Sequence, residues 1–328
     1  MASDSYERID KLLTRAERHI AATFAAMIDS LRDDLDLKKV ADLIETGRWD
    51  KAFEYIERRA AELGAASNLM FVRAGADTAA FMASMGIAEI AFDQVNYRGV
   101  EKMRENRLRL IREFTDGQRD TLRSVMADGI ARGLGPRDQA RQFREVVGLT
   151  ERQAKAVLNY RRLLGQVGDA DAADQAEALT RALRDKRHDR TILAAIRDQR
   201  PLSKDQIDKM TERYRQKYVK YRAEMIARTE ALRSVHEGVA EAFDQAIDRG
   251  DIDADQIEQK WSSARDHRVR DSHRYLNGQK RPLGGVWTTS NGTLRYPGDP
   301  QAPASETVQC RCIVVRRIVA LRDAPVLI

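Results

Sequence analysis

Apolar residues recur at steps of three and four through two long stretches of this chain, residues 9–35 and 207–247. This spacing places them along one face of an α-helix. Both stretches far exceed an average helix, so the sequence predicts two long amphipathic helices whose apolar faces need a covering surface. The apolar positions are Ile9, Leu12, Leu13, Ala16, Ile20, Phe24, Met27, Ile28, Leu31 and Leu35 in the first stretch and Ile207, Met210, Tyr214, Tyr218, Tyr221, Met225, Leu232, Val235, Val239, Phe243 and Ile247 in the second.

The segments between these two helices are helical as well. A second helix is expected to begin near Trp49, and a third to run over residues 100–130. Capping boxes, in which a Ser or Thr precedes a Gln by three residues, open a further helix at 150–153 and the second long helix at 203–206. Gly250 is expected to end the last long helix.

Two interruptions divide the chain. Gly-Leu-Gly-Pro at 133–136 is a clear break, and residues 165–174, rich in Gly, Asp and Ala, are expected to form a loop. We place the first boundary at the Gly-Leu-Gly-Pro break. We expect an N-terminal helical region at 1–134, a middle helical region at 135–203, which contains the loop, and a C-terminal domain at 204–328.

Composition excludes several classes of protein. Two cysteines that are one residue apart cannot supply a disulfide framework for 328 residues. The sequence shows neither a secretory signal pattern nor an apolar run near the ~18 residues of a membrane span, so we expect a protein made and kept in a cytosol. With 57 basic and 51 acidic residues the chain is mildly basic, which suits contact with DNA phosphates but not a dedicated nucleic-acid binder.

Short elements replace the long helices after Asp255. A strand is expected at 257–262, an Asn-Gly turn at 277–278, a hairpin turn at 290–292 and a last strand over 308–318. The predicted fold class is therefore mainly α, with long amphipathic helices and a small C-terminal α+β domain docked against the last of them.

This tail concentrates residue types that bind metals. In a strand, residues two apart point the same way, so Cys310 and Cys312 would present both sulfurs on one face, with Cα atoms too far apart for an easy disulfide. Zn²⁺ takes four ligands from Cys, His and carboxylate, and His273 with Asp266 or His267 would complete such a set. The alternative is that both cysteines are small buried hydrophobic residues. The hypothesis is thus a structural zinc site formed by Asp266, His273, Cys310 and Cys312.

A metal-activated nuclease centre is the catalytic interpretation of the same residues. It requires a second acid or base beside the metal, for which Asp271 and Asp299 are the local candidates. The alternative is a polar network in which Arg268 or Arg270 pairs with Asp266 and His273 caps a turn. We favour the network, because the acids show no recognisable catalytic arrangement.

Two ionisable residues fall on or beside the apolar stripe of the last long helix. They are Arg228 and His236, and Glu230 lies about two positions round the helix from Arg228, so it does not face it. Charged side chains are almost never fully buried unless they are paired, which makes both positions unusual.

The tail carries an ordered series of motifs. They are Arg228-Thr229-Glu230, Trp261, Asp266-x-Arg268-x-Arg270-x-x-His273, Gly278-Gln279, Tyr296-Pro297-Gly298-Asp299-Pro300 and Cys310-Arg311-Cys312. Over residues 204–316 this series resembles the C-terminal domain of the phage Mu F-like minor head (head morphogenesis) family. Residues 148–154 resemble the helical segment that often precedes that domain. The Asp, His and paired Cys are signature positions of the family, without an established catalytic role.

The resemblance implies a non-enzymatic structural protein of a tailed phage or prophage. Such proteins lie inside the head of the virion at the portal vertex, in several copies, and in the host cytoplasm during assembly. The implied partners are the portal protein, other virion head proteins and, as an open possibility, double-stranded DNA bound without sequence preference, with no membrane during assembly. The implied roles are head assembly and the packaging or ejection of DNA.

Three functions follow as alternatives, of which the third is a sequence-independent DNA binder without chemistry, whose affinity would fall steeply with salt. In the first, the long helices bind the portal through exposed apolar stripes, and the tail forms a rigid unit. In the second, the protein is a metal-dependent DNA-processing enzyme, a nuclease, that uses Asp266, His273 and the two cysteines.

Overall fold

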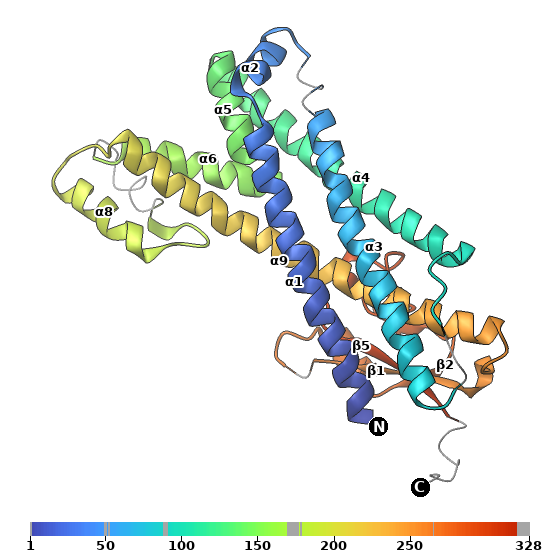
Figure 1. Ribbon diagram of the computed structural model, residues 1–328. Coiled ribbons are helices and arrows are strands. Elements are labelled where there is room, and N and C mark those ends of the chain that lie inside the picture. Colours follow the sequence, from blue (N-terminus) through green and yellow to red (C-terminus); the bar gives the residue numbers. More distant parts are fainter. Residues whose placement is uncertain are drawn as a thin grey trace. The chain divides into compact units, whose positions relative to one another are not determined.

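Helices dominate the chain, which confirms the fold class expected from the sequence (Figure 1). The computed structural model describes residues 2–48, 51, 53–87, 91–168, 177, 179–264 and 266–319. The helices are α1 (Ala2–Asp34), α2 (Leu37–Glu45), α3 (Phe53–Ser84), α4 (Tyr97–Ala131), α5 (Pro136–Val146), α6 (Glu151–Gln166), α8 (Lys186–Arg197), α9 (Lys204–Asp248), α10 (Asp271–Leu276) and α11 (Ala304–Thr307). The strands are β1 (Ile257–Ser262), β2 (Lys280–Pro282), β3 (Trp287–Thr289), β4 (Gly292–Leu294) and β5 (Ile313–Ile318). Within the described ranges, no helix combines the length and apolar character needed to cross a bilayer.

The chain divides into two compact units, each assembled from separate segments. Unit 1 contains Met1–Thr23, Leu63–Arg109 and Glu224–Ile328, and unit 2 contains Phe24–Glu62 and Leu110–Ala223. The division falls inside α1, α3, α4 and α9, so each of these helices supplies one segment to each unit. All five strands belong to unit 1.

In unit 2, an aromatic and polar core joins segments that are distant in sequence. Phe24 and Phe114 pack edge to face, with ring centroids 5.8 Å apart. The Gln118 amide donates to the Leu149 carbonyl and accepts the Gly148 N–H, which fixes the turn before α6. That turn leads into the predicted capping box of α6, where both reciprocal hydrogen bonds are present.

In unit 1, α3 and α9 approach each other closely. A Cβ atom at Gly238 would overlap the carbonyl oxygen of Phe71, so the contact requires a glycine at this position. The hydroxyls of Ser67 and Ser234 lie 2.7 Å apart and share a hydrogen bond inside the same contact. Small residues on both helices therefore let their backbones meet.

The apolar stripes of the two long helices are buried within the chain. In α1, Ile9, Leu13, Ala16, Ile20, Phe24, Met27, Ile28 and Leu31 are each at most 6% exposed, and in α9, Met210, Tyr214, Leu232, Val235, Val239 and Phe243 are each at most 5% exposed. The expectation that these stripes are exposed is therefore wrong at these positions, while Tyr221 of α9, another predicted stripe position, is 46% exposed. Other helices of the chain cover the buried positions, as α4 covers Phe24 with Phe114.

The tail forms two small antiparallel sheets. β1 is the centre of the first sheet, with β2 on one side and β5 on the other, and Trp261 of β1 lies opposite Val314 of β5. β3 and β4 form the second, a hairpin around the predicted turn. The strand at 257–262 and this hairpin confirm the sequence prediction.

Three details differ from the sequence prediction or lie outside the description. The last strand begins at Ile313 rather than 308, because its ladder with β1 starts at the pair Ser262–Ile313 and the preceding residues turn. A separate helix, α2, follows α1, because Asp36 caps it by accepting the backbone N–H groups of the first turn. Residues 169–174 of the expected loop, and Trp49, lie outside the described residues.

His236 joins α9 to the first sheet. Its Nδ1 atom lies 2.8 Å from the Leu232 carbonyl oxygen, and its Nε2 atom accepts the Val314 N–H at 3.1 Å. The ring also stacks on Tyr296, with centroids 6.1 Å apart. Burial lowers the pKa of His236 to about 4, so the imidazole is neutral near pH 7. This neutral ring explains how an ionisable residue lies on the apolar stripe.

The first prediction concerns the pH dependence of stability. Because the folded-state pKa of His236 lies below its unfolded value, its contribution is complete above pH 6.5 and declines as the pH falls toward 4. We expect this decline to amount to about 3 kcal/mol. In His236→Gln, which keeps an acceptor for the Val314 N–H but does not titrate, the free energy of unfolding should fall less over this range.

The measurement is denaturant unfolding at several pH values between 7 and 4, with His267→Gln as the control. His267 is exposed, so its replacement should leave the wild-type slope unchanged. Parallel curves for wild type and His236→Gln would contradict the prediction.

Candidate metal centre

Short elements of unit 1 bring one histidine and both cysteines together. His273 lies in α10, and Cys310 and Cys312 lie in the segment between α11 and β5. Gln309 has a positive φ of 58°, and the Cys310 N–H donates to the Thr307 carbonyl, so the chain turns before it enters the sheet. The two cysteines therefore reach the histidine from a turn and not from the strand that the sequence predicted.

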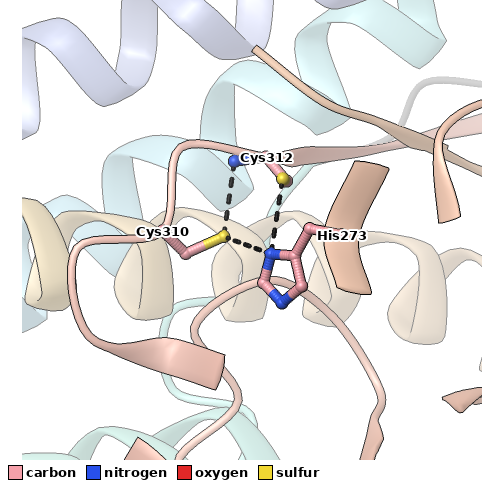
Figure 2. Close-up of side chains that lie close together, drawn as sticks. All are labelled: His273, Cys310 and Cys312. Carbon is pink, nitrogen blue, oxygen red and sulfur yellow. Dashed lines mark hydrogen bonds between the residues drawn. The ribbon is translucent and has the colours of Figure 1, made fainter. Parts of the chain in front are cut away.

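The three side chains form one buried cluster, shown in Figure 2. Nδ1 of His273 lies 3.3 Å from Sγ of Cys310 and 3.6 Å from Sγ of Cys312. The Cys312 N–H donates to Sγ of Cys310, which holds the sulfurs at the same end of the turn. Each of the three residues is at most 2% exposed.

These distances suit a tetrahedral metal ion. Zinc binds thiolate sulfur at about 2.3 Å and imidazole nitrogen at about 2.0–2.1 Å, so two such ligands at the tetrahedral angle lie about 3.5 Å apart. The two sulfur–nitrogen distances in the cluster bracket that value. The group could therefore hold a metal ion through both sulfurs and Nδ1.

The cluster also has the charge that a cation requires. The hydrogen bond with Cys310 and the neighbouring His273 lower the pKa of the Cys312 thiol to about 5, while the same hydrogen bond and burial raise the pKa of Cys310. Within the pair, the thiolate form is therefore favoured on Cys312 over Cys310. A cation would displace the proton that remains on Cys310, because metals bind the deprotonated form.

Glu306 lies behind the histidine ring. Nε2 of His273 is 2.6 Å from Oε2 of Glu306, a carboxylate with no solvent exposure. Asn291 and Ser272 donate hydrogen bonds to the same carboxylate. Burial opposes ionisation of Glu306, but the hydrogen bond from Asn291 and the nearby His273 lower its pKa overall. Glu306 thus lies beside Nε2 while Nδ1 faces the sulfurs, which is the placement of carboxylates behind metal-bound histidines.

Asp266 is held by arginines and is not in the cluster. Its carboxylate forms ion pairs with Arg311 and, at 3.4 Å, with Arg268, and these contacts hold its pKa far below the usual value. It is not among the residues whose ligand atoms lie within 4.8 Å of one another, and His267 is exposed. The expected pairing of Asp266 with Arg268 is present. Its assignment as a fourth metal ligand stays a prediction.

The acids considered for a nuclease centre have other partners. Asp271 pairs with Arg274 at 2.7 Å and is exposed. Asp299 binds the Arg295 guanidinium and accepts the Arg295 and Gln301 N–H groups, which closes the loop that contains it. Neither acid belongs to the His–Cys–Cys cluster.

Comparison with known families identifies the region that holds the cluster. Residues 174–315 match the family model described as Phage Mu protein F like protein. These residues form a phage Mu F-like domain. The resemblance seen in the sequence is thereby confirmed, and the domain contains all three cluster residues as well as Glu306. No curated protein and no solved structure matches the chain.

Mu F-like proteins are phage head morphogenesis proteins, and the family is a structural one, generally without enzymatic activity. Sequence reasoning named both cysteines and His273 but missed Glu306 and the Arg311 partner of Asp266. Glu306 lies four residues before Cys310, in a short Ala-Ser-Glu-Thr helix whose position gave no sign that it faces His273.

The second prediction tests the role of Glu306. Glu306→Gln removes the charge that orients the His273 ring, so the affinity for a divalent metal should fall about 10- to 100-fold. Titration with Co²⁺, followed by its thiolate absorption, measures this affinity. Trp261 lies 5.2 Å from the His273 ring centroid and provides a second, fluorescence readout.

Glu224→Gln is the matched control, because Glu224 is exposed on α9. An unchanged metal affinity in Glu306→Gln would show that the Glu306 carboxylate does not orient the His273 ring for metal binding.

Proposed function

We propose that this chain is a minor head protein at the portal vertex of a phage virion, acting in head assembly and in the packaging or ejection of DNA. The observation that supports it best is the Mu F-like domain at 174–315, which contains the buried cluster. The partners in this proposal are the portal protein, other head proteins and, through the net charge of +6, the phosphates of double-stranded DNA.

We further propose that the cluster is a structural zinc site. Three features support this: two sulfurs beside Nδ1 at zinc-like separations, a lowered pKa of the Cys312 thiol, and a buried carboxylate behind the histidine. His273, Cys310 and Cys312 would hold the ion, and the fourth position is open to Asp266 or water. Bound zinc would supply a cross-link between α10 and the turn before β5.

The nuclease alternative has less support. The cluster residues are at most 2% exposed, so a scissile phosphate cannot reach them without opening the domain. Asp271 and Asp299, the acids that could assist, pair with arginines. A binding and scaffolding role agrees with both facts.

The third prediction tests the structural metal. Cys310→Ala and Cys312→Ala should each cost more free energy of unfolding than truncating a buried methyl-sized group, about 1 kcal/mol, because metal binding is coupled to folding. Chelation should lower the melting temperature of wild type toward that of the cysteine variants.

Val315→Ala is the control, since Val315 is buried in β5 but lies outside the cluster. In chelator, the free energy of unfolding of Val315→Ala should remain below that of wild type. The free energies of unfolding of the cysteine variants should instead become close to that of wild type. Elemental analysis that finds no bound metal in the purified protein would end the zinc proposal.

The fourth prediction tests the proposed function. Co-expression with the portal protein of the same phage should give a complex that survives size-exclusion chromatography. Binding of the complex to double-stranded DNA should weaken as salt rises, with a log–log slope of about −2 or steeper if two or more phosphates are neutralised.

A monomer that does not associate with the portal would contradict the proposal. Cleavage of supercoiled DNA in Zn²⁺, Mg²⁺ or Mn²⁺, lost in His273→Ala, would favour the nuclease instead.

A further inference from the structure

A second site of unit 1 lies between α4, α9 and the first sheet. It is a cavity of about 480 Å³, within the size range of ligand pockets. Its lining includes the basic residues Lys102, Arg295 and Arg316. None of these residues belongs to the His–Cys–Cys cluster.

Arg316 is the unusual member of this lining. It lies in β5, opposite Gln259 of β1, and is only 8% exposed. Its Nε and Nη1 atoms are buried without a hydrogen-bond partner among the described residues, and no ion pair to it is found there. Burial lowers the pKa of Arg316 to about 10, which leaves the guanidinium charged at neutral pH. A buried charge without a partner is strongly destabilising, so an anion bound to the Arg316 guanidinium would stabilise the folded protein.

The other cations of the lining already have anions. Lys102 pairs with Glu241 at 2.9 Å, and Arg295 pairs with Asp299 at 2.6 Å. Asp244 attracts Arg316 through space but is itself in contact with Lys102 at 3.4 Å. Among the described residues that line the cavity, Arg316 is therefore the basic group without a carboxylate partner.

The charges around Arg316 decide which anion fits. Glu105, Glu237 and Asp244 also line the cavity. These acidic groups disfavour a phosphate dianion or a DNA backbone more than a single carboxylate, which balances one guanidinium and can accept hydrogen bonds from it. Leu283 and Pro300 add apolar surface that a free inorganic ion would leave unused. A carboxylate on a peptide, with neighbouring atoms that contact this surface, fits better than a small acid.

We propose that this cavity binds an acidic side chain of a partner polypeptide, with the Arg316 guanidinium as its receptor. The proposal concerns a site separate from the metal centre and stands whether or not zinc is bound. It assigns to the Mu F-like domain a recognition pocket for a Glu or Asp residue of another protein.

The test uses a blocked Gly-Glu-Gly tripeptide and its Gly-Gln-Gly counterpart, titrated into the full chain by calorimetry at low salt. The Glu peptide should bind at least about 10-fold more tightly than the Gln peptide, because charge-assisted hydrogen bonds to a buried guanidinium are lost with the amide. Arg316→Met should weaken binding of the Glu peptide about 10- to 100-fold. Arg316→Met should also fold at least as stably as wild type, because it removes an unpaired buried charge.

Arg317→Met, which changes the next residue of β5, is the control and should bind as wild type does. If Arg316→Met does not fold, Arg316→Lys provides the comparison, because an ammonium cannot form the paired hydrogen bonds and should still weaken binding. Equal binding of the Glu and Gln peptides, or wild-type binding by the Arg316 variant that folds, would overturn the proposal. Acetate or phosphate binding as tightly as the Glu peptide would overturn the choice of a peptide ligand.

Discussion

The hydrogen bond from the Val314 N–H to the buried His236 ring organises the tail of this protein. It attaches the edge strand β5 to the long helix α9 (Figure 1). Cys312 lies two residues before Val314, and Arg316 lies two residues after it. This contact therefore lies close in the chain to both the His–Cys–Cys cluster and the Arg316 guanidinium. The contact requires a neutral imidazole, which burial ensures near pH 7.

Buried polar groups add to the apolar core that Trp261 and Trp287 form in this small α+β region. The His273 ring lies between the two sulfurs and the Glu306 carboxylate, and Glu306 is in turn bound by Asn291 and Ser272. Such a network specifies one arrangement, because each unsatisfied member would carry a desolvation cost. Short strands of three residues, such as β3 and β4, can then pair without a thick core.

Local patterns made much of this fold predictable. Three- and four-residue spacing identified α1 and α9, the capping boxes identified the starts of α6 and α9, and the turn at 290–292 identified the hairpin. Each of these signals depends on residues that are close in sequence. The burial of the α1 stripe could not be foreseen in this way, because Phe24 meets Phe114 only through the tertiary fold.

The candidate site was only partly visible for the same reason. Residue type and spacing singled out Cys310 and Cys312, but the partner of His273 is Glu306, more than thirty positions further along the chain. In the sequence, Arg316 looks like an ordinary arginine of a strand. Only the folded structure shows that its Nε and Nη1 atoms are buried without a hydrogen-bond partner among the described residues. Both sites depend on distances between elements that are far apart in the sequence. Local periodicity does not indicate these distances.

The depth of the sulfur atoms has a further consequence. A thiolate at neutral pH is the form of cysteine most readily oxidised, and surface thiolates are lost to sulfenic acid or mixed disulfides outside a reducing compartment. Cys310 and Cys312 are each 2% exposed, so the folded domain shields both sulfurs from solution. The cluster can therefore persist in an oxidising environment that would inactivate an exposed pair.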